Sequence, residues 1–458
     1  MKQRSLMVFL LLFTTVVTAQ DIAGTWQGTL SLPAVKLRLV FHITKTDSGY
    51  TSTMDSPDQG AAGIPMDVTS YKKDSLTLSL NRLALRYQGT YRSDSDIVQG
   101  TFTQSVVSVP LTLRRGNSST APVVRPQEPK SFSYRTEEVE FINPRGGNRL
   151  VGTLTMPAGG KASSVVVMIT GSGPQDRNEE LRPFNHRPFL VWSDWLTRQG
   201  IAVLRYDDRG VGKSNGSFQG ATSADFADDA EAAVSYILSR PDLKALSIGL
   251  MGHSEGGMIA PVVATRNKAV KFVVLLAAPG IPVARLMEDQ TEDQMRLSGA
   301  GSEMIAAGVE ESHAIYSALV KYKDLPDSLL KRRMDSLLIQ RLKEKPASDV
   351  SGRLLDPWFR YFITFDPQFY LSKLTCPVLA LNGTKDSQVR STPNLEGIRA
   401  SLQKAGNKHF EVVALPGLNH LFQRCSTGSL SEYGEIEETV NPQALEKVAA
   451  WINRLPLK

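Results

Sequence analysis

Cysteine and metal-binding motifs are scarce in this chain. Only Cys376 and Cys425 occur among its 458 residues, and two thiols cannot frame a disulfide-rich domain or a four-cysteine zinc site. Cys376 is predicted to begin a buried strand and Cys425 to lie beyond its far end, so we expect two separate thiols. The sequence also lacks an H-E-x-x-H motif, a complete P-loop and a complete dinucleotide-binding motif. We therefore expect no metal and no other cofactor.

The sequence also has no large excess of one charge and no long apolar run beyond its N-terminus. The 52 Lys and Arg residues exceed the 46 Asp and Glu residues by only six. Because no dense basic block accompanies this excess, we expect no nucleic-acid partner. Beyond the N-terminus, no segment approaches the roughly 18 uninterrupted apolar residues of a membrane helix. A hydrophobic content of 41% nevertheless excludes a wholly disordered chain.

The N-terminus, residues 1–19, is predicted to be a signal peptide. Lys2 and Arg4 precede an apolar stretch over 6–17 that is too short to span a bilayer comfortably. The small residue Ala19 offers a cleavage site. A signal anchor left in place is the alternative, although nothing lengthens the apolar stretch. We expect the chain to be exported, to the periplasm or out of the cell.

Residues 20–115 are predicted to form a small antiparallel β-barrel or sandwich. Short alternating segments separated by polar turns are typical of such domains. Gly24-Thr25-Trp26 at the start resembles the opening of lipocalin-like modules. The domain could hold an apolar ligand, but no ligand-binding group stands out, which favours a docking or stabilising role. The predicted strands are 35–43, 49–54, 75–80, 83–91, 97–104 and 108–113.

The rest of the chain is predicted to be a linker, residues 116–134, and one α/β domain, residues 135–458. The linker is rich in Ser, Thr and Pro. In the α/β domain, apolar runs alternate with helical patterns, which predicts a mostly parallel, eight-stranded sheet. A helical insertion over 281–371 is predicted to be a cap, whose methionines either fill its core or line a substrate cleft. The predicted strands are 139–142, 150–156, 164–170, 201–206, 247–251, 271–277, 378–381 and 410–415.

The pattern G-x-S-x-G occurs twice, around Ser214 and around Ser254. Ser254 directly follows a predicted strand and precedes a helix start made of small residues. Such a sharp strand-to-helix turn exposes a serine Oγ above the sheet. Ser214 lies in a polar loop with no strand directly before it. We therefore predict that Ser254 is a nucleophile and that Ser214 is a loop residue.

A serine hydroxyl becomes a strong nucleophile only when a base removes its proton and an acid orients that base. Asp386 and His420 each follow a predicted strand, at the sheet edge where α/β domains collect their functional groups. We therefore predict a catalytic triad of Ser254, Asp386 and His420. Glu396 is a distant alternative to Asp386, and His186 is a secondary candidate for the wall of the cleft.

The negative oxygen that forms during attack on a carbonyl needs two N–H donors, each worth about 3 kcal/mol. One is predicted to be the backbone N–H of Glu255, directly after the nucleophile. The other is predicted to come from the loop after the strand at 164–170. Gly171 and Gly173 let the backbone there approach a substrate, and we choose the N–H of Ser172, with those of Gly171 and Gly173 as close alternatives.

With these residues placed, the region from 135 to 458 resembles an α/β hydrolase with a helical cap. It is similar to exported serine carboxylesterases and serine aminopeptidase-like hydrolases, and the resemblance covers about seven-tenths of the chain. Many relatives have His before the oxyanion loop, whereas this chain has Thr170. The shared motifs are Gly-His-Ser-Glu-Gly-Gly at 252–257, the stretch at 171–177 and the stretch at 206–214.

The resemblance implies hydrolysis of a small-molecule ester through an acyl-enzyme on Ser254. The same triad would serve an aminopeptidase, which needs an acidic group for the amine of its substrate. Glu255, Glu288 and Glu292 are candidates for that group. Epoxide hydrolases and dehalogenases of similar fold need an Asp nucleophile, and Ser254 argues against them. A non-catalytic binding protein would not need the ordered triad, and the sequence does not predict an oligomeric state.

Overall fold

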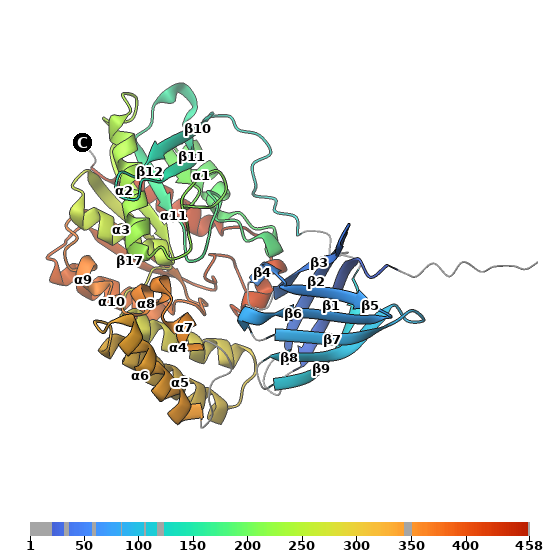
Figure 1. Cartoon of the computed structure of the whole chain (residues 1–458). Helices are drawn as coiled ribbons and strands as arrows, with labels where there is room; N and C mark the ends of the chain where they lie inside the picture. Colours follow the sequence, from blue (N-terminus) through green and yellow to red (C-terminus); the bar gives the residue numbers. More distant parts are fainter. Residues whose placement is uncertain are drawn as a thin grey trace, which may run out of the picture.

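The computed structural model describes residues 21–31, 36–56, 61–83, 85–104, 107–116, 123–342 and 350–456. The predicted signal peptide therefore lies outside the described residues. Two sheets organise the chain: a nine-stranded sheet near the N-terminus and an eight-stranded sheet beyond it (Figure 1). Within the described ranges, no helix combines the length and the apolar character needed to cross a bilayer.

The nine-stranded sheet is antiparallel throughout and curls into a half-barrel, in the order β4-β3-β2-β1-β9-β8-β7-β6-β5. Its edge strands β4 and β5 are consecutive in sequence. Between them, the N–H of Met66 donates to the carbonyl of Ser52 on β3 (3.0 Å), which draws the two edges together. The strands are β1 (Gly24–Ser31), β2 (Lys36–Thr46), β3 (Gly49–Ser56), β4 (Ala61–Pro65), β5 (Val68–Lys72), β6 (Ser75–Leu80), β7 (Leu85–Arg92), β8 (Ile97–Gln104) and β9 (Val107–Arg115).

The core of the half-barrel is apolar and includes Trp26. The Trp26 indole is fully buried, donates to the carbonyl of Ile22 (2.8 Å) and lies under the Arg115 guanidinium. The antiparallel all-β prediction is confirmed, but β1 was not among the predicted strands, and neither were β4 and β5. Their side chains are mostly half-buried or exposed, so the alternation that marks the other strands is weak there. The lipocalin resemblance stays a prediction.

The eight-stranded sheet has the order β10-β11-β13-β12-β14-β15-β16-β17. β11 runs antiparallel to both β10 and β13, and the other neighbours run parallel. The mostly parallel eight-stranded sheet is thus confirmed. The strands are β10 (Arg135–Ile142), β11 (Arg149–Met156), β12 (Ser164–Ile169), β13 (Ile201–Tyr206), β14 (Ser247–His253), β15 (Val270–Leu276), β16 (Val378–Gly383) and β17 (Phe410–Leu415).

Helices cover both faces of this sheet because its strands are apolar on both sides. Along β12, Val165 and Val167 belong to one apolar cluster and Val166 to the other, as a period of two requires. The first cluster packs against α2 (Ser223–Ser239), α3 (Glu255–Arg266) and α10 (Ser391–Lys404). The second packs against α1 (Pro188–Arg198) and α11 (Pro442–Arg454).

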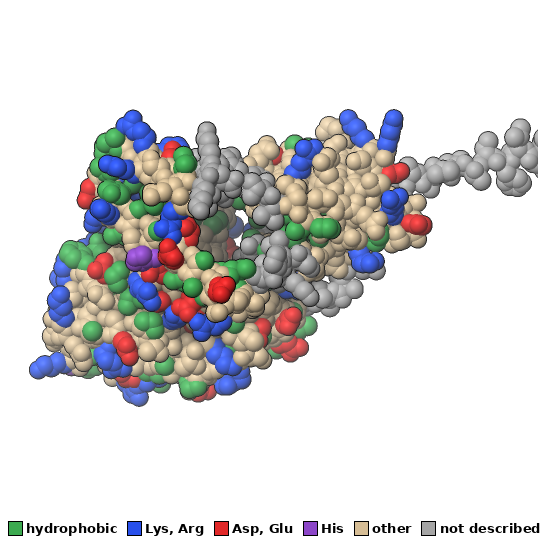
Figure 2. Space-filling model, turned by 90° about the horizontal axis from the view of Figure 1, so that it is seen from below, with side chains coloured by type: hydrophobic (Ala, Val, Ile, Leu, Met, Phe, Trp, Pro, Cys, Tyr) green, Lys and Arg blue, Asp and Glu red, His purple; other side chains and the backbone are tan. Residues whose placement is uncertain are grey.

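The insertion between β15 and β16 is helical and forms a layer at one end of the sheet (Figure 1). Acidic and basic side chains are interspersed over the face seen from that end (Figure 2). The helices are α4 (Val283–Leu297), α5 (Ser302–Lys321), α6 (Asp327–Leu342), α7 (Val350–Leu354), α8 (Pro357–Ile363) and α9 (Gln368–Leu371). Short 3-10 helices elsewhere are η2 (Asn81–Leu83), η3 (Ala158–Gly160), η4 (Arg182–Phe184) and η5 (Leu430–Gly434).

The segment between the two sheets is not a free spacer along its whole length. Part of it, 117–122, lies outside the described residues, but the stretch from 123 onward lies on the α/β domain. Arg125 is only 6% exposed, and Gln127 bonds to the backbone of Val440. Residues 123–128 of the predicted linker are therefore bound to the α/β domain through their polar side chains.

Candidate active site

Ser254 lies at a sharp turn between the end of β14 and the start of α3. Its backbone is in the left-handed half of the map, with φ 52° and ψ −118°, which is strained for a residue other than glycine. Glycines make the turn possible: a Cβ on Gly252 would lie 2.0 Å from the carbonyl oxygen of Gly256, and one on Gly256 would lie 2.2 Å from that of Ile169. The turn therefore holds the Ser254 side chain at the carboxyl end of β14.

Asp386 and His420 lie together in the loops after β16 and β17. His420 Nδ1 is 2.8 Å from Asp386 Oδ2, so the ring donates its Nδ1 proton to the carboxylate and leaves Nε2 as an acceptor. The other carboxylate oxygen, Oδ1, accepts the backbone N–H groups of Gln388 and Val389, both at 2.8 Å. The Asp386 side chain is fully buried. These contacts fix both the carboxylate and the tautomer of the imidazole.

Ser254 and His420 line one cavity of about 230 Å³. The structure thus brings two of the predicted triad residues to a common cavity and sets the third against His420. One wall of this cavity is apolar and contains Phe184, Leu421 and Tyr433. A hydroxyl, a base and an apolar wall at one cavity are suited to attack on the carbonyl of a partly apolar substrate.

The structure shows which of the candidate backbone N–H groups near Ser254 are free to bind an oxyanion. A Cβ on Gly171 would lie 3.3 Å from the Cβ of Ser254, so the loop after β12 passes beside the hydroxyl. The Gly171 N–H already donates to Glu179 Oε1 at 2.7 Å, so Ser172 is a better donor than Gly171. Glu255 is the first residue of α3, so its N–H has no acceptor inside the helix.

Glu179 and His253 form a buried pair beside the predicted triad that the sequence did not reveal. Glu179 Oε1 lies 3.0 Å from His253 Nδ1, and His253 Nε2 lies 3.1 Å from the carbonyl oxygen of His420. Both neighbouring atoms are oxygens, so the site suits an imidazole that donates from both ring nitrogens. Burial on its own lowers the pKa of His253, but the adjacent Glu179 carboxylate outweighs burial and leaves that pKa raised.

Glu179 therefore links the oxyanion loop to the backbone of His420. We expect Glu179→Gln to lower kcat for p-nitrophenyl acetate by about tenfold, because a hydrogen bond to a charged acceptor is worth about 1 kcal/mol more than one to a neutral acceptor. Steady-state kinetics would measure this loss. The neighbouring Glu180, which pairs with Arg187, provides the control variant Glu180→Gln. Equal kcat values for Glu179→Gln and the wild type would contradict the link.

The side chain of Glu255 is engaged away from the Ser254 cavity. Its Oε1 accepts from Ser223 Oγ (2.5 Å) and from Trp358 Nε1 (2.9 Å), and burial raises its pKa. Glu255 thus ties α8 of the cap to α2 and α3. Thr170, directly before the oxyanion loop, donates to Asp208 Oδ1 (2.9 Å).

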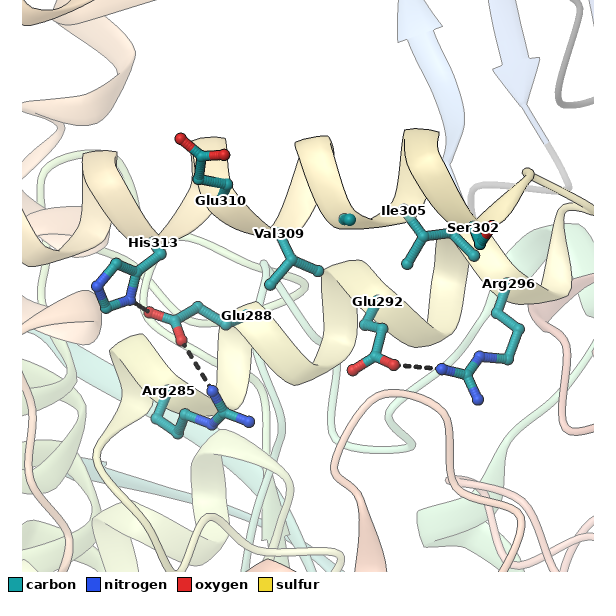
Figure 3. Close-up of a pocket in the computed structure, with 10 residues that line it drawn as sticks. Arg285, Glu288, Glu292, Arg296, Ser302, Ile305, Val309, Glu310 and His313 are labelled. Carbon is teal, nitrogen blue, oxygen red and sulfur yellow. Dashed lines mark hydrogen bonds and ion pairs between the residues drawn. The ribbon is translucent and has the colours of Figure 1, made fainter.

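A second cavity, of about 800 Å³, lies between α4 and α5 in the cap (Figure 3). Five of its charged or titratable side chains, Arg285, Glu288, Glu292, Arg296 and His313, pair with one another, and Glu310 pairs with Arg341. Glu288 accepts from Arg285 (3.2 Å) and from His313 (2.9 Å), and Glu292 is bonded to Arg296. Both cap carboxylates predicted as amine-binding groups are therefore already neutralised by cations.

Other residues considered from the sequence have structural roles. His186 is fully buried, its Nε2 lies 2.9 Å from the carbonyl oxygen of Thr439, and burial lowers its pKa to about 3. It supports the loop after β17 rather than the wall of the cleft. Ser214 donates to the carbonyl of Asp207 (2.7 Å).

Cys376 and Cys425 are free thiols, and the described part of the chain contains no cluster of His, Cys, Asp and Glu that could hold a metal.

The chain is similar to several known proteins. The serine aminopeptidase family S33 matches residues 190–334. The chain is 26% identical to Esterase EstD of Thermotoga maritima over 325 residues, 71% of this chain and 68% of that protein. It is 28% identical to the uncharacterised protein YfhR of Escherichia coli K12 over 27% of this chain and 40% of that protein. A solved esterase of Pyrococcus furiosus superimposes with a TM-score of 0.42 at 16% identity, covering 70% of this chain and 92% of that one.

Proposed function

The chain is a serine hydrolase of the α/β-hydrolase superfamily, and from that premise we propose that it cleaves carboxylic esters through an acyl-enzyme on Ser254. The observation that supports this most directly is the strained Ser254 turn at a cavity shared with His420. Strain of this kind persists where the surroundings impose it and is typical of functional sites. A protein that only binds its ligand needs neither the strained hydroxyl nor the oriented base.

Acylation begins when His420 Nε2 accepts the proton of Ser254 Oγ and the oxygen attacks the ester carbonyl. The carbonyl oxygen becomes an oxyanion, which the N–H groups of Glu255 and Ser172 stabilise. Asp386 holds the imidazole in the tautomer that accepts at Nε2 and stabilises its charged form. The tetrahedral species then collapses, its C–O bond to the leaving alcohol breaks, and His420 returns the proton to that alcohol.

Deacylation repeats these roles with water as the nucleophile. His420 removes a proton from the water, the hydroxide attacks the acyl carbon, and the same two N–H groups stabilise the second oxyanion. The bond between the acyl carbon and Ser254 Oγ then breaks, and the proton returns to the serine. The products are a carboxylic acid, an alcohol and the free enzyme.

The distribution of acidic groups favours an ester over a peptide with a free amine. Glu255, Glu288 and Glu292 already accept from neighbouring side chains. Glu179 lines the Ser254 cavity, but its Oε1 accepts from two donors and its Oε2 is buried. An aminopeptidase needs a carboxylate free to bind the substrate amine, so we propose carboxylesterase activity in preference to aminopeptidase activity.

A matched panel of substrates tests this choice. We expect p-nitrophenyl butyrate to be hydrolysed with a kcat/KM well above that of alanine and leucine p-nitroanilides, because the cavity offers apolar contacts and no free carboxylate. Release of nitrophenol or nitroaniline is followed at pH 7, with Ser254→Ala as the blank.

Two outcomes would contradict the proposal. Cleavage of the anilides at least as efficient as that of the ester, lost when the substrate amine is acetylated, would identify an aminopeptidase. Equal turnover by the wild type and Ser254→Ala on every substrate would indicate a protein whose function is binding.

A further inference from the structure

Arg125 precedes the eight-stranded sheet in sequence but lies in the interior of the α/β domain. Its guanidinium forms no hydrogen bond to a carboxylate among the described residues and is surrounded instead by main-chain carbonyls. It donates to the carbonyl oxygens of Phe184 (2.7 Å), Asn185 (3.2 Å), Tyr433 (3.0 Å), Ile436 and Glu438 (3.3 Å). A planar guanidinium with five donors can satisfy so many acceptors at once, and no other side chain can.

The five carbonyls belong to two loops that are distant in sequence. One contains η4 and the other contains η5, and the contacts to Arg125 span between 59 and 313 residues of chain. The loops meet at a contact between the rings of Phe184 and Tyr433, with centroids 5.9 Å apart and planes at 80°. Arg125 therefore bonds two separate loops at the point where their aromatic rings touch.

These two rings form part of the apolar wall of the Ser254 cavity. Phe184, Leu421 and Tyr433 are a buried cluster of their own, against which Leu181 and Leu430 pack. All five line the cavity that Ser254 and His420 share. The Tyr433 hydroxyl also accepts from Gln388 Nε2 (3.0 Å), two residues beyond Asp386. The wall thus depends on loops that share no strand or helix.

The segment around Arg125 is bound to the same two loops by further contacts. Gln127 Oε1 accepts the N–H of Thr439 (2.6 Å), and its Nε2 donates to the carbonyl of Val440 (2.6 Å). Glu128 pairs with Arg187 at 2.9 Å. Three side chains within four residues therefore bind the loops that contain η4 and η5.

We propose that Arg125 is a positioning residue that shapes the apolar wall of the Ser254 cavity, and that this wall receives a linear alkyl group of the ester substrate. The inference rests on the proposed esterase function. In this proposal, the segment that joins the two sheets influences which substrates the Ser254 cavity accepts. The alkyl group could belong to the acid or to the alcohol, since both flank the same carbonyl.

Kinetics on the full chain test the proposal. We expect Arg125→Lys to lower the ratio of kcat/KM for p-nitrophenyl octanoate to that for p-nitrophenyl acetate by about tenfold, mainly through KM, because contacts to a few methylenes are worth that much. Arg125→Met should lower the ratio further. Octyl acetate compared with ethyl acetate gives the alcohol-side measurement. Arg135→Lys is the matched control, because Arg135 follows the same segment and pairs with Glu137 on the surface.

The outcomes separate the possibilities. A ratio unchanged on both the acid and the alcohol side in folded Arg125→Lys and Arg125→Met would overturn the proposal, even if the melting temperature fell. If both variants fail to fold, Gln127→Ala, which loosens the same loops less, should lower the ratio about threefold, and an unchanged ratio there would overturn it. A wild type that hydrolyses none of the esters would refute the esterase function itself.

Discussion

Ser254→Ala should reduce kcat for p-nitrophenyl acetate by about 10⁶-fold, the loss expected when the nucleophile of a serine triad is removed. The variant keeps the turn, the oxyanion donors and the cavity, so the remaining rate reflects those elements alone. Pre-steady-state measurements with substrate in excess would also detect the absence of a burst of nitrophenol. A loss smaller than about tenfold would mean that another group forms the acyl-enzyme.

Ser214 provides the matched control, because it is the central serine of the second G-x-S-x-G pattern. Its hydroxyl is buried and bonded to Asp207 and Val151. We expect Ser214→Ala to lower the free energy of unfolding by about 1 kcal/mol while kcat stays within a factor of about three of the wild type. The contrast between the two alanine variants distinguishes the motif in the turn from the same motif in a loop.

Asp386→Asn should lower kcat by about 10⁴-fold, and the surroundings of Asp386 explain why. The N–H groups of Gln388 and Val389 both donate to Oδ1, so the amide oxygen of an asparagine would occupy that position. Its NH₂ group would then face His420 and donate to Nδ1. The imidazole would have to place its proton on Nε2, where it could no longer accept the proton of Ser254.

Two further variants sharpen this prediction. Asp386→Ala removes the acceptor without donating to Nδ1, so it should retain more activity than Asp386→Asn. Equal losses would show that the charge of the carboxylate matters and the tautomer does not. Glu396, the more distant acid, is exposed on α10, and Glu396→Gln should leave kcat unchanged.

The sheet of the α/β domain was predictable because its strands are short apolar runs separated by helical patterns. Ser254, Asp386 and His420 could be proposed for the same reason, since Ser254 directly follows a strand and the other two lie in the loops just after one. The strands β4 and β5 could not be predicted, because partly exposed side chains leave little alternation. The contacts of the residues that surround the triad could not be predicted either, because their partners are remote in sequence.

Arg125 illustrates that limit. A stretch rich in Ser, Thr and Pro indicates a linker, and one arginine inside it gives no sign of burial. Its acceptors are main-chain carbonyls, which every residue possesses, so no sequence pattern marks them. Glu179 is similar: it follows the oxyanion-loop motif by two residues, but its contact with His253 depends on a left-handed backbone, with φ 52°.

The position of the cap has a consequence for how such a protein can diversify. The cap leaves the sheet after β15 and returns at β16, and these strands pair directly with each other. Its two ends are joined by a bond from Gln368 to the carbonyl of Gly280 (3.2 Å) and by one from Val283 to that of Phe365 (3.0 Å). Because these two bonds hold the ends of the cap together, inserting residues between them costs little additional conformational entropy. The cap can gain, lose or exchange helices over evolutionary time while Ser254, Asp386 and His420 keep their places.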